Sequence, residues 1–374
     1  MAEKCLGTSA EAAEGYIGRI PVRNLWLLML YASELFQTRG IGKIGLEDSP
    51  DELPDLVAEI LVHAVEKRQR RALSRGYRTR DAVLNRVRGR IDIVRNETHQ
   101  LLARGLIACR FEDFTIDTPR NRFVRAALDA ICRVVSRGDL GHQCRSLAAA
   151  MKAQGVSGNV PTRAELSVDR IGRHDVDDSV MVNAAKLAID LALPTETDGS
   201  GVLFLPDREM TWVRRLFEHA VGGFYSVGLS PAGWRVRCGG TLEWQVGQQT
   251  AGIDRILPSM RTDIILEHAG AGQRIIVDTK FTSIVTTGWY REETLRSAYL
   301  YQIYAYIRSQ VGKGDALADS ATGLLLHPAV GTAVDENVII QGHMIRFATV
   351  DLAASATAIR SRLLWLCGSA GGTS

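Results

Sequence analysis

The sequence lacks the cysteine patterns that mark zinc sites and disulfide frameworks. Its six cysteines are scattered along 374 residues, and no two of them form a C-x-x-C pair. This distribution favours a reducing compartment, so we expect the protein in the cytoplasm. Residues 1–18 hold no apolar signal-peptide core, and the apolar run 25–32 is far too short to span a membrane. We therefore expect no membrane association.

Two further motif classes are missing. The chain contains no G-x-x-x-x-G-K-[ST], so it has no P-loop of its own for binding and hydrolysing a nucleotide. It has no helix-turn-helix or zinc signature either, which disfavours a stand-alone DNA-binding protein. Lysine is also scarce, because only seven of the 45 basic residues are lysine and the rest are arginine.

The bulk composition is that of an ordinary globular protein. It is 46% hydrophobic and 23% charged, and the length allows two domains with separate cores. A net charge of +3 is too small to indicate a nucleic-acid partner. Residues 66–95 nevertheless hold eleven Lys or Arg against three acids, which are Glu66, Asp81 and Asp92. This basic block suits DNA phosphates or an acidic partner surface, but a solvated helix and loop surface explains it equally well.

Hydrophobic periodicity predicts an α/β (α+β) chain with two domains, residues 16–195 and 196–367, divided within Pro194–Ser200. Thr118 followed by Pro119 predicts a capped helix start. In the first domain we expect helices at 25–36, 53–73, 121–135 and 179–193, strands at 86–94 and 106–115, and a loop at 153–162. In the second we expect helices at 209–225, 292–309 and 353–366, and strands at 241–245, 262–266, 274–280, 323–327 and 345–352.

One stretch of the second domain carries candidate chemistry. Asp263 opens an apolar strand, residues 269–273 form a Gly-containing turn, and the next apolar strand ends in Asp278-Thr279-Lys280. Asp278 and Lys280 are two residues apart on a strand, so their side chains point to the same face. Two carboxylates and an ammonium make poor core material, but they suit a hard cation such as Mg²⁺ held against a phosphate.

The D-x-K pattern alone is weak evidence, since a chain of this length contains about one by chance. Here it is the only [DE]-x-K in the sequence, it ends an apolar strand, and it places one of the rare lysines. A compact ammonium acts differently from a guanidinium beside a metal ion. On the residues alone, a surface hairpin with an ion pair remains the alternative.

Two flanking helices offer further candidates. Glu218 lies on an amphipathic helix before the hairpin and is a candidate third carboxylate, although pairing with Arg214 four residues earlier explains it as well. Gln302 shares a helical face with Tyr299 and Tyr306, and its amide needs a polar partner that the metal site would provide.

Two other features are expected to be structural. Residues 174–178, His-Asp-Val-Asp-Asp, contain metal-ligand residue types but are typical of a solvated acidic loop. His327 follows a strand near the predicted site, and we expect a histidine whose hydrogen bonds are satisfied within the fold.

Several of these segments, in the same order along the chain, resemble the McrC family, the endonuclease subunits of McrBC modification-dependent restriction systems. The resemblance runs from about residue 20 to about residue 352. It is carried by I-P-V-R-N-L-W-L-L-M-L-Y-A near the start, V-R-G-R-I-D at 87–92, F-T-I-D-T-P-R-N-R at 114–122, L-F-E at 216–218, D-T-K-F at 278–281, Y-Q-I-Y-A-Y at 301–306 and G-L-L-L-H-P at 323–328.

The resemblance implies a PD-(D/E)xK restriction-endonuclease-like second domain, with a mixed central sheet flanked by helices. It implies Asp263, Asp278 and Lys280 as the catalytic set, with Glu218 and Gln302 as helpers. Asp263, Asp278, Thr279 and Glu218 would be the metal-binding positions for Mg²⁺, or Mn²⁺ in its place. Thr262 stands where a proline is frequent in the family and Thr279 where a small residue is common, but neither change removes a ligand group.

The resemblance also implies partners and explains the missing P-loop. Members of this family work with a McrB-like AAA+ GTPase hexamer, which recognises modified DNA, and their first domain docks on it and stimulates hydrolysis. Residues 16–195 would take that role here, and double-stranded DNA carrying 5-methylcytosine would be the substrate. The alternatives are an inactive adaptor of an AAA+ NTPase and a nuclease of the same fold that acts on unmodified DNA in another defence system.

Overall fold

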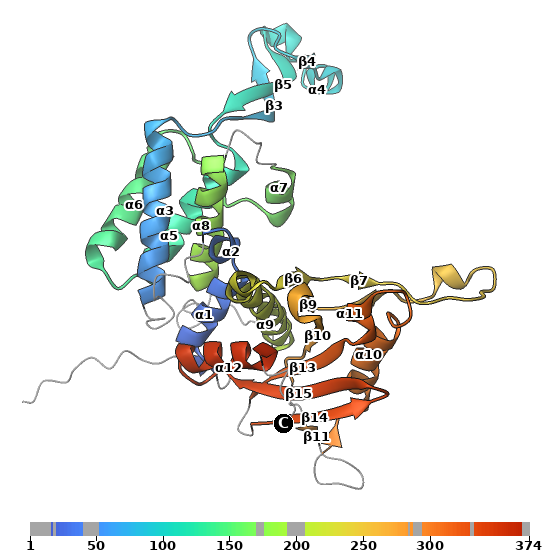
Figure 1. The fold of residues 1–374 in the computed structure, drawn as a ribbon. Coiled ribbons are helices and arrows are strands. Elements are labelled where there is room, and N and C mark those ends of the chain that lie inside the picture. Colours follow the sequence, from blue (N-terminus) through green and yellow to red (C-terminus); the bar gives the residue numbers. More distant parts are fainter. Residues whose placement is uncertain are drawn as a thin grey trace, which may run out of the picture. The chain divides into compact units, whose positions relative to one another are not determined.

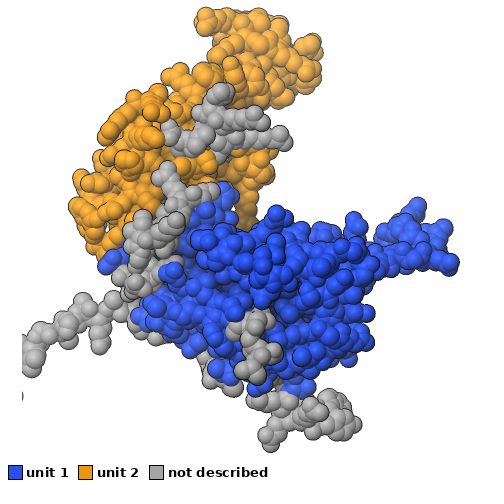
Figure 2. Space-filling model, viewed as in Figure 1, with its two compact units in different colours: residues 1–53, 197–374 blue, residues 54–196 orange. Residues whose placement is uncertain are grey.

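The computed structural model describes residues 16–17, 20–39, 52–169, 176–192, 206–282, 285–286, 294–329 and 333–368. The chain divides into two compact units, which Figure 2 colours separately. Unit 1 comprises residues 1–53 and 197–374, and unit 2 comprises residues 54–196. Among the described residues, none of the helices combines the length and the hydropathy needed to cross a membrane. The expected boundary at 194–200 lies outside the described residues.

Unit 1 is built on a mixed sheet with the strand order β14-β15-β13-β10-β9-β6. β6, β9 and β10 are antiparallel to one another, β10, β13 and β15 run parallel, and β14 returns antiparallel to β15. The strands are β6 (Arg235–Cys238), β9 (Ile264–His268), β10 (Gln273–Thr279), β13 (Thr322–Ala329), β14 (Asp335–Ile340) and β15 (His343–Asp351). A mixed sheet with helices confirms the α/β class predicted from the sequence.

Helices pack against this sheet (Figure 1). α9 (Pro206–Gly228) lies along β6, α10 (Ser297–Arg308) packs on β10 and β13, and α12 (Ala356–Gly368) packs on β15. The short α11 (Ala316–Asp319) contacts β10. Buried residues between α10 and the sheet form one hydrophobic cluster, which includes Ile276, Ile303, Ile307, Leu325 and Phe347. Ile276 and Asp278 are two apart on β10, so Asp278 follows this cluster along the α10 face of the sheet.

Along the chain, an extension separates β6 from β9, although the two strands are neighbours in the sheet. The expected strand 241–245 is only the two-residue β7 (Thr241–Leu242), which pairs with β8 (Met260–Arg261). Residues 243–259 between them project away from the sheet (Figure 1). Two further two-stranded ribbons are β1 (Tyr16–Ile17) with β2 (Ile20–Pro21), and β11 (Val285–Thr286) with β12 (Thr294–Leu295).

The start of the described chain belongs to unit 1, whereas the sequence placed residues 16–195 in one domain. α1 (Val22–Ala32) packs along α9, and the Asn24 amide donates to the carbonyl oxygens of Leu352 at 2.6 Å and Ala354 at 3.0 Å. The expected single helix 25–36 is divided at Ser33, which is extended, and whose hydroxyl accepts from the Phe36 N–H at the start of α2 (Glu34–Arg39). Contacts distant in sequence therefore decide where this segment belongs.

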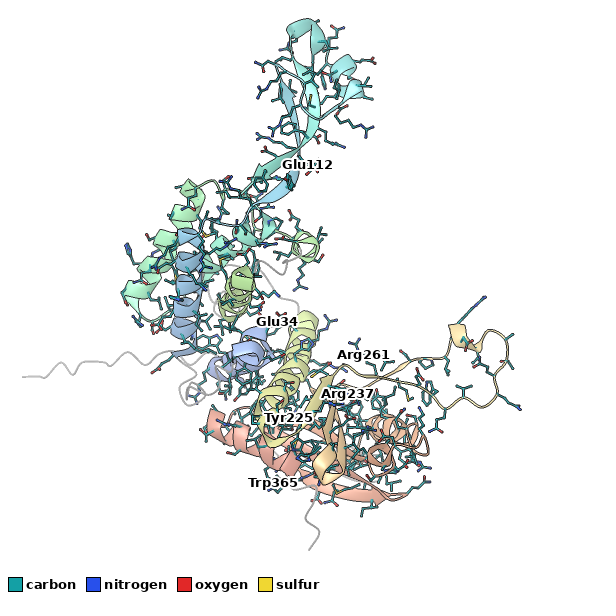
Figure 3. The ribbon with its side chains drawn as sticks, turned by 45° about the horizontal axis from the view of Figure 1, so that its top comes forward. Glu34, Glu112, Tyr225, Arg237, Arg261 and Trp365 are labelled. Atoms are coloured by element: carbon teal, nitrogen blue, oxygen red, sulfur yellow. The ribbon has the colours of Figure 1, made fainter. Side chains whose placement is uncertain are left out.

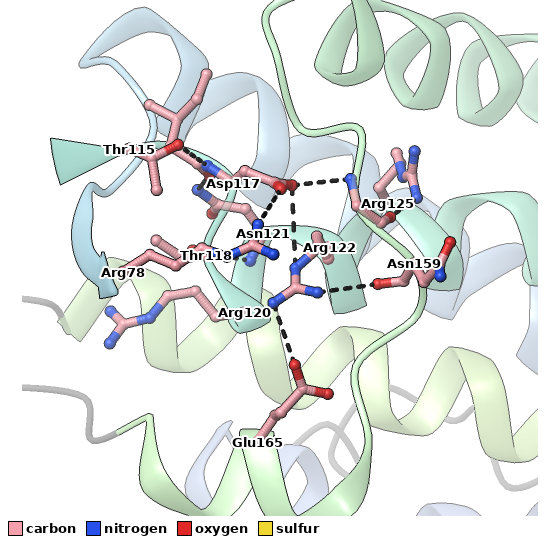
Figure 4. A network of polar contacts seen from close by, with 12 residues as sticks. Arg78, Thr115, Asp117, Thr118, Arg120, Asn121, Arg122, Arg125, Asn159 and Glu165 are labelled. Carbon is pink, nitrogen blue, oxygen red and sulfur yellow. Dashed lines mark hydrogen bonds and ion pairs between the residues drawn. The ribbon is translucent and has the colours of Figure 1, made fainter. Parts of the chain in front are cut away.

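Unit 2 centres on α5 (Pro119–Ile131), which packs against α6 (Gly138–Ala153) and α8 (Val176–Ala192). The predicted cap is confirmed, because the Thr118 hydroxyl accepts from the Asn121 N–H and Pro119 opens the helix. α3 (Leu53–Arg70) and α7 (Arg163–Val168) complete the described helices of this bundle. Figure 4 shows how Arg122 ties α5 to the expected loop 153–162, through the Asn159 carbonyl oxygen, and to Glu165 of α7.

The predicted strand 86–94 is largely wrong. Only β4 (Arg90–Ile91) forms there, because Gly89 has a φ of +67° and Asp92 caps α4 (Ile93–Thr98) by accepting from the Arg95 N–H. The long strand is β3 (Gly76–Leu84), which pairs antiparallel along the whole of β5 (Ile107–Thr115). β3 carries no apolar alternation in its sequence, because most of its residues are exposed on both faces.

The expected solvated loop at 174–178 is wrong from residue 176 onward, where α8 begins. Asp178 is fully buried in unit 2 and forms ion pairs with Arg68 at 2.7 Å and Arg120 at 2.8 Å. Asp169 also pairs with Arg120 at 2.7 Å. The neighbouring residues 170–175 lie outside the described part of the chain. Asp178 therefore neutralises two arginines inside the bundle instead of lying on a solvated surface.

We predict that Gly223→Ala destabilises unit 1 by about 1–3 kcal/mol, because the added methyl would overlap the Tyr31 carbonyl oxygen where α1 crosses α9. Gly228→Ala in the same helix is the matched control. Its new methyl meets Leu364 at an ordinary 3.5 Å, so it should be neutral or slightly stabilising. Urea unfolding of both variants measures the effect, and equal midpoints would contradict the close α1–α9 packing.

Candidate functional site

The β9–β10 hairpin brings the predicted aspartates together. Its turn is the short helix η8 (Ala269–Ala271) followed by Gly272, whose φ of +64° favours glycine. The antiparallel register pairs Val277 with Ile264, so the next pair along the ladder is Asp278 and Asp263. Both aspartates thus stand at the same end of the hairpin, as the sequence predicted.

Asp263 is held in place by its neighbours. Its carboxylate Oδ2 accepts hydrogen bonds from the backbone N–H of Thr279 at 2.7 Å and from the Thr279 hydroxyl at 2.8 Å. Its backbone carbonyl accepts from the Gly239 N–H at 2.7 Å. Figure 3 labels Arg261, which precedes Asp263 by two residues, and Arg237 on the adjacent β6. Thr279, a predicted metal-binding position, is therefore joined to Asp263 through both its backbone and its hydroxyl.

Asp278 and Lys280 form a buried ion pair. The Lys280 Nζ lies 2.7 Å from Asp278 Oδ2, and the two residues are 6% and 1% exposed. Burial raises the pKa of Asp278 to about 6; Lys280 opposes this rise and the charge of Asp263 adds to it. Asp278 Oδ1 is buried without a hydrogen-bond partner in the described part of the chain. A buried carboxylate oxygen that lacks a donor is costly unless a cation or solvent completes it.

Glu218 approaches the same site from α9. It is half-buried, and burial followed by repulsion from Asp263 raises the pKa of its carboxyl. The charges of His219 and Arg214 lower it. The structure thus brings Glu218 into the electrostatic environment of Asp263.

Gln302 finds a different partner from the one expected. Its amide donates to the Tyr306 hydroxyl at 2.6 Å, one helical turn further along α10. Burial raises the pKa of Tyr306, and the charges of Asp278 and Asp263 raise it further. Tyr306 therefore bonds to Gln302 and also senses the charges of the two aspartates. The spacing of four residues between Gln302 and Tyr306 was the sequence signal for their contact.

The sequence did not link Lys280 to the Tyr299 ring, or Tyr299 to His327. The Lys280 Nζ lies 5.2 Å from the centroid of the Tyr299 ring, and that ring lies 5.9 Å from the His327 ring. As expected, His327 has a structural partner, since its Nδ1 lies 2.9 Å from the Thr282 carbonyl oxygen. Burial, with help from Lys280 and Arg296, lowers the pKa of His327 to about 4.

The two aspartates of the site offer the oxygen ligands that a magnesium ion takes. No group of three or more His, Cys, Asp or Glu in the described part of the chain is arranged to enclose a metal. Mg²⁺, however, is usually held by one or two carboxylates together with waters and substrate phosphate. Asp263 and Asp278 supply two carboxylates, and the unpartnered Oδ1 of Asp278 supplies an oxygen that a cation would complete.

The buried His327 predicts a pH-dependent stability. Its folded pKa of about 4 lies below the ordinary 6.5, so the unfolded chain binds the proton first and stability falls as pH drops from 6.5 toward 4. Relative to His327→Gln, the wild type should lose roughly 3 kcal/mol across that window. Urea unfolding at several pH values measures this difference. An exposed control, His99→Gln, should stay within about 0.5 kcal/mol of wild type. A wild-type minus His327→Gln difference that does not change with pH would refute the assignment.

Comparison with known proteins identifies relatives along most of the chain. The chain is 24% identical over 347 residues to the type IV methyl-directed restriction enzyme EcoKMcrBC of Escherichia coli K12, covering 92% of this chain and 96% of that protein.

Two solved assemblies from Thermococcus gammatolerans overlap with the chain more loosely. One is a half-complex of McrB AAA+ hexamers with bound McrC, with 14% identity, a TM-score of 0.38, and coverage of 84% of this chain and 68% of that chain. The other is a McrBC complex, with 15% identity, a TM-score of 0.30, and coverage of 48% and 58%.

The profile of the family described as McrBC 5-methylcytosine restriction system component matches residues 6–326. This range contains both aspartates of the hairpin, Lys280 and the helix that carries Gln302. The match confirms the family that the ordered sequence motifs indicated. The chain belongs to the McrBC 5-methylcytosine restriction system component family.

Proposed function

We propose that this chain is the DNA-cleaving subunit of a McrBC-like restriction system and hydrolyses phosphodiester bonds at the Asp263–Asp278–Lys280 site. The observation that carries the proposal is the buried Asp278–Lys280 pair beside Asp263, with one carboxylate oxygen of Asp278 unpartnered. Such a cluster is costly to bury, so a catalytic role accounts for it best.

The topology around the site supports a PD-(D/E)xK assignment. The two aspartates lie at one end of the antiparallel β9–β10 hairpin, and the other edge of β10 pairs in parallel with β13. Helix α10 covers the face that Asp278 shares with Ile276. A mixed sheet with helices against it is the scaffold that the family resemblance implies for this nuclease class. We therefore assign the nuclease domain to unit 1.

Each residue of the site has a distinct chemical task in this proposal. Asp263 and Asp278 would bind Mg²⁺, and Mn²⁺ in its place, with Glu218 as an additional carboxylate. The bound ion would polarise the scissile phosphate and lower the pKa of a bound water. Asp278 has a pKa of about 6, so at neutral pH it is mostly ionised and ready to act as a ligand. Lys280 holds a positive charge where negative charge develops on the phosphate.

A McrB-like AAA+ GTPase is the proposed partner, and DNA containing 5-methylcytosine is the proposed substrate. Family membership and the absence of a P-loop in the sequence support this division of labour. The E. coli relative is named a type IV methyl-directed restriction enzyme.

The β3–β5 ribbon of unit 2 is the proposed docking element. It projects beyond the helices of its unit (Figure 1) and exposes Tyr77 and Phe114, whose rings lie 5.0 Å apart. Arginines of the basic block lie on the same ribbon, and several pair with acids there, for example Arg80 and Arg88 with Asp113. Because the ribbon neutralises part of its own charge, the exposed rings of Tyr77 and Phe114 favour a protein partner over bare phosphates.

We predict that Lys280→Ala and Asp278→Ala each lower DNA cleavage by about a thousandfold or more, because each removes a charge needed beside the phosphate. Cleavage of methylated plasmid, with the partner GTPase, GTP and Mg²⁺ present, measures the loss, and EDTA should abolish wild-type cutting.

Lys313→Ala is the matched control, since Lys313 is an exposed lysine of the same unit and bonds the Glu243 carbonyl. It should cut like the wild type, and both site variants should still assemble with the partner. Normal cutting by Lys280→Ala or Asp278→Ala would show that the site is wrongly assigned.

A second prediction concerns nucleotide hydrolysis. The purified chain should hydrolyse neither GTP nor ATP, because it has no P-loop, yet it should raise the GTPase rate of the partner. Phosphate release, measured for each protein alone and for the mixture, distinguishes these contributions. GTP hydrolysis by the pure chain would contradict the division of labour, and an unchanged partner rate would contradict docking.

A further inference from the structure

The Lys280 ammonium has two close neighbours of different kinds. One is the carboxylate of Asp278 at 2.7 Å, and the other is the face of the Tyr299 ring, whose centroid lies at 5.2 Å. A cation within about 6 Å of a ring centroid is attracted by the ring quadrupole, and the attraction grows when the cation is removed from water. Lys280 is 6% exposed, so its contact with Tyr299 belongs to the stronger class.

The ion pair with Asp278 is an incomplete support for this ammonium. In the proposed reaction the same Asp278 carboxylate serves as a metal ligand, so Lys280 at Oδ2 and the metal ion at Oδ1 share one carboxylate. The lysine ammonium also carries three N–H donors on a flexible side chain, so one ion pair does not fix its orientation. The Tyr299 ring has no part in metal binding and therefore offers Lys280 a partner that persists when Asp278 is engaged.

The Tyr299 ring packs against a second, buried aromatic ring. Tyr299 lies in the first turn of α10, and its ring packs against the ring of His327 on β13 at 5.9 Å. His327 is 1% exposed and is anchored to the Thr282 carbonyl oxygen at 2.9 Å. Thr282 follows Lys280 by two residues, so Thr282, His327, Tyr299 and Lys280 make a closed series of contacts around the end of β10.

The other tyrosines of this part of α10 do not share the task. Tyr306 receives the hydrogen bond from Gln302, Tyr304 donates to Gln341, and Tyr301 is 67% exposed. Arg296 also lies over the Tyr299 ring, at 6.0 Å, but it is an exposed residue and its attraction is correspondingly weaker.

From this geometry we propose that Tyr299 is a positioning residue for the nuclease reaction, whose ring face orients the Lys280 ammonium toward the scissile phosphate. The inference rests on the proposed function for its catalytic meaning, while the contact itself is a property of the folded chain. It requires the aromatic ring and not the hydroxyl group, so phenylalanine should replace tyrosine and leucine should not.

The contact is tested first without any activity. In full-length protein labelled with ¹³C at the lysine ε-carbon, the ring current of Tyr299 should shift the Lys280 ε-methylene resonance upfield, and Lys280→Arg identifies that resonance. The upfield shift should persist in Tyr299→Phe, with and without Mg²⁺, and disappear in Tyr299→Leu. Tyr301→Leu is the matched control on the same helix and should leave the shift unchanged.

Cleavage kinetics test the positioning role. With the partner and Mg²⁺, Tyr299→Leu should lower kcat about tenfold, while KM for DNA stays within about twofold, because substrate contacts are retained. Tyr299→Phe should stay within about threefold of wild type. Tyr301→Leu should match the wild type.

The two measurements separate the possible failures. A Lys280 resonance that does not move in Tyr299→Leu overturns the inference, as does a Tyr299→Phe variant whose kcat falls as far as that of Tyr299→Leu. If the wild type cuts no DNA while the resonance behaves as described, the proposed function fails and the Tyr299–Lys280 contact stands.

Discussion

The burial of a charged pair at the end of β10 is the constraint on which the rest of the site depends. Asp278 and Lys280 lie side by side on one face of the sheet, almost fully removed from water. Taking two ions out of water costs several kcal/mol for each ion, and their mutual attraction offsets this only when the geometry is good and further partners are present. Tyr299 supplies one such partner by contacting the ammonium, whereas the charge of Asp263 raises the pKa of both Asp278 and Glu218 and so opposes their ionised forms.

The hairpin itself illustrates why this position suits chemistry. Strand pairing holds the backbones of β9 and β10, and the hydrophobic cluster beneath α10 holds the strand from one face. The site residues lie where β9–β10 pairing ends while β13 still pairs with β10, so they stand on a rigid scaffold. Thr279 connects the two strands at this point, because its N–H and hydroxyl both donate to Asp263.

The sequence predicted the parts of the molecule that alternation and turn chemistry mark clearly. The apolar strands β9, β10, β13 and β15 were found within a few residues, together with the proximity of Asp263 and Asp278. The Thr118–Pro119 helix start was found because its signal is local. β3 was missed because its exposed, arginine-rich strand has no apolar face, and its pairing with β5 is a long-range fact.

Tertiary contacts account for the other differences. The segment 16–53 carries no local signal that assigns it to unit 1, since that assignment comes from packing between α1 and α9. Asp178 read as part of an acidic loop because the two arginines that surround it lie 58 and 110 positions earlier. Tyr299 looked like one aromatic residue among several on α10, and only the fold selects it as the neighbour of Lys280. The catalytic roles of the predicted site residues stay a proposal.

The extension between β7 and β8 leaves the sheet immediately beside the site, yet its base is closed by short backbone hydrogen bonds. Gly239 donates to the Asp263 carbonyl at 2.7 Å, and Thr262 donates to the Gly240 carbonyl at 2.8 Å. Beyond this closure, Glu243 and Gln245 still bond to residues 309–313, whereas the described bonds of residues 247–256 stay within the extension. Insertions, deletions or whole grafted segments at 247–256 would therefore be absorbed without disturbing the carboxylate, which makes this extension the place where such a scaffold can diversify.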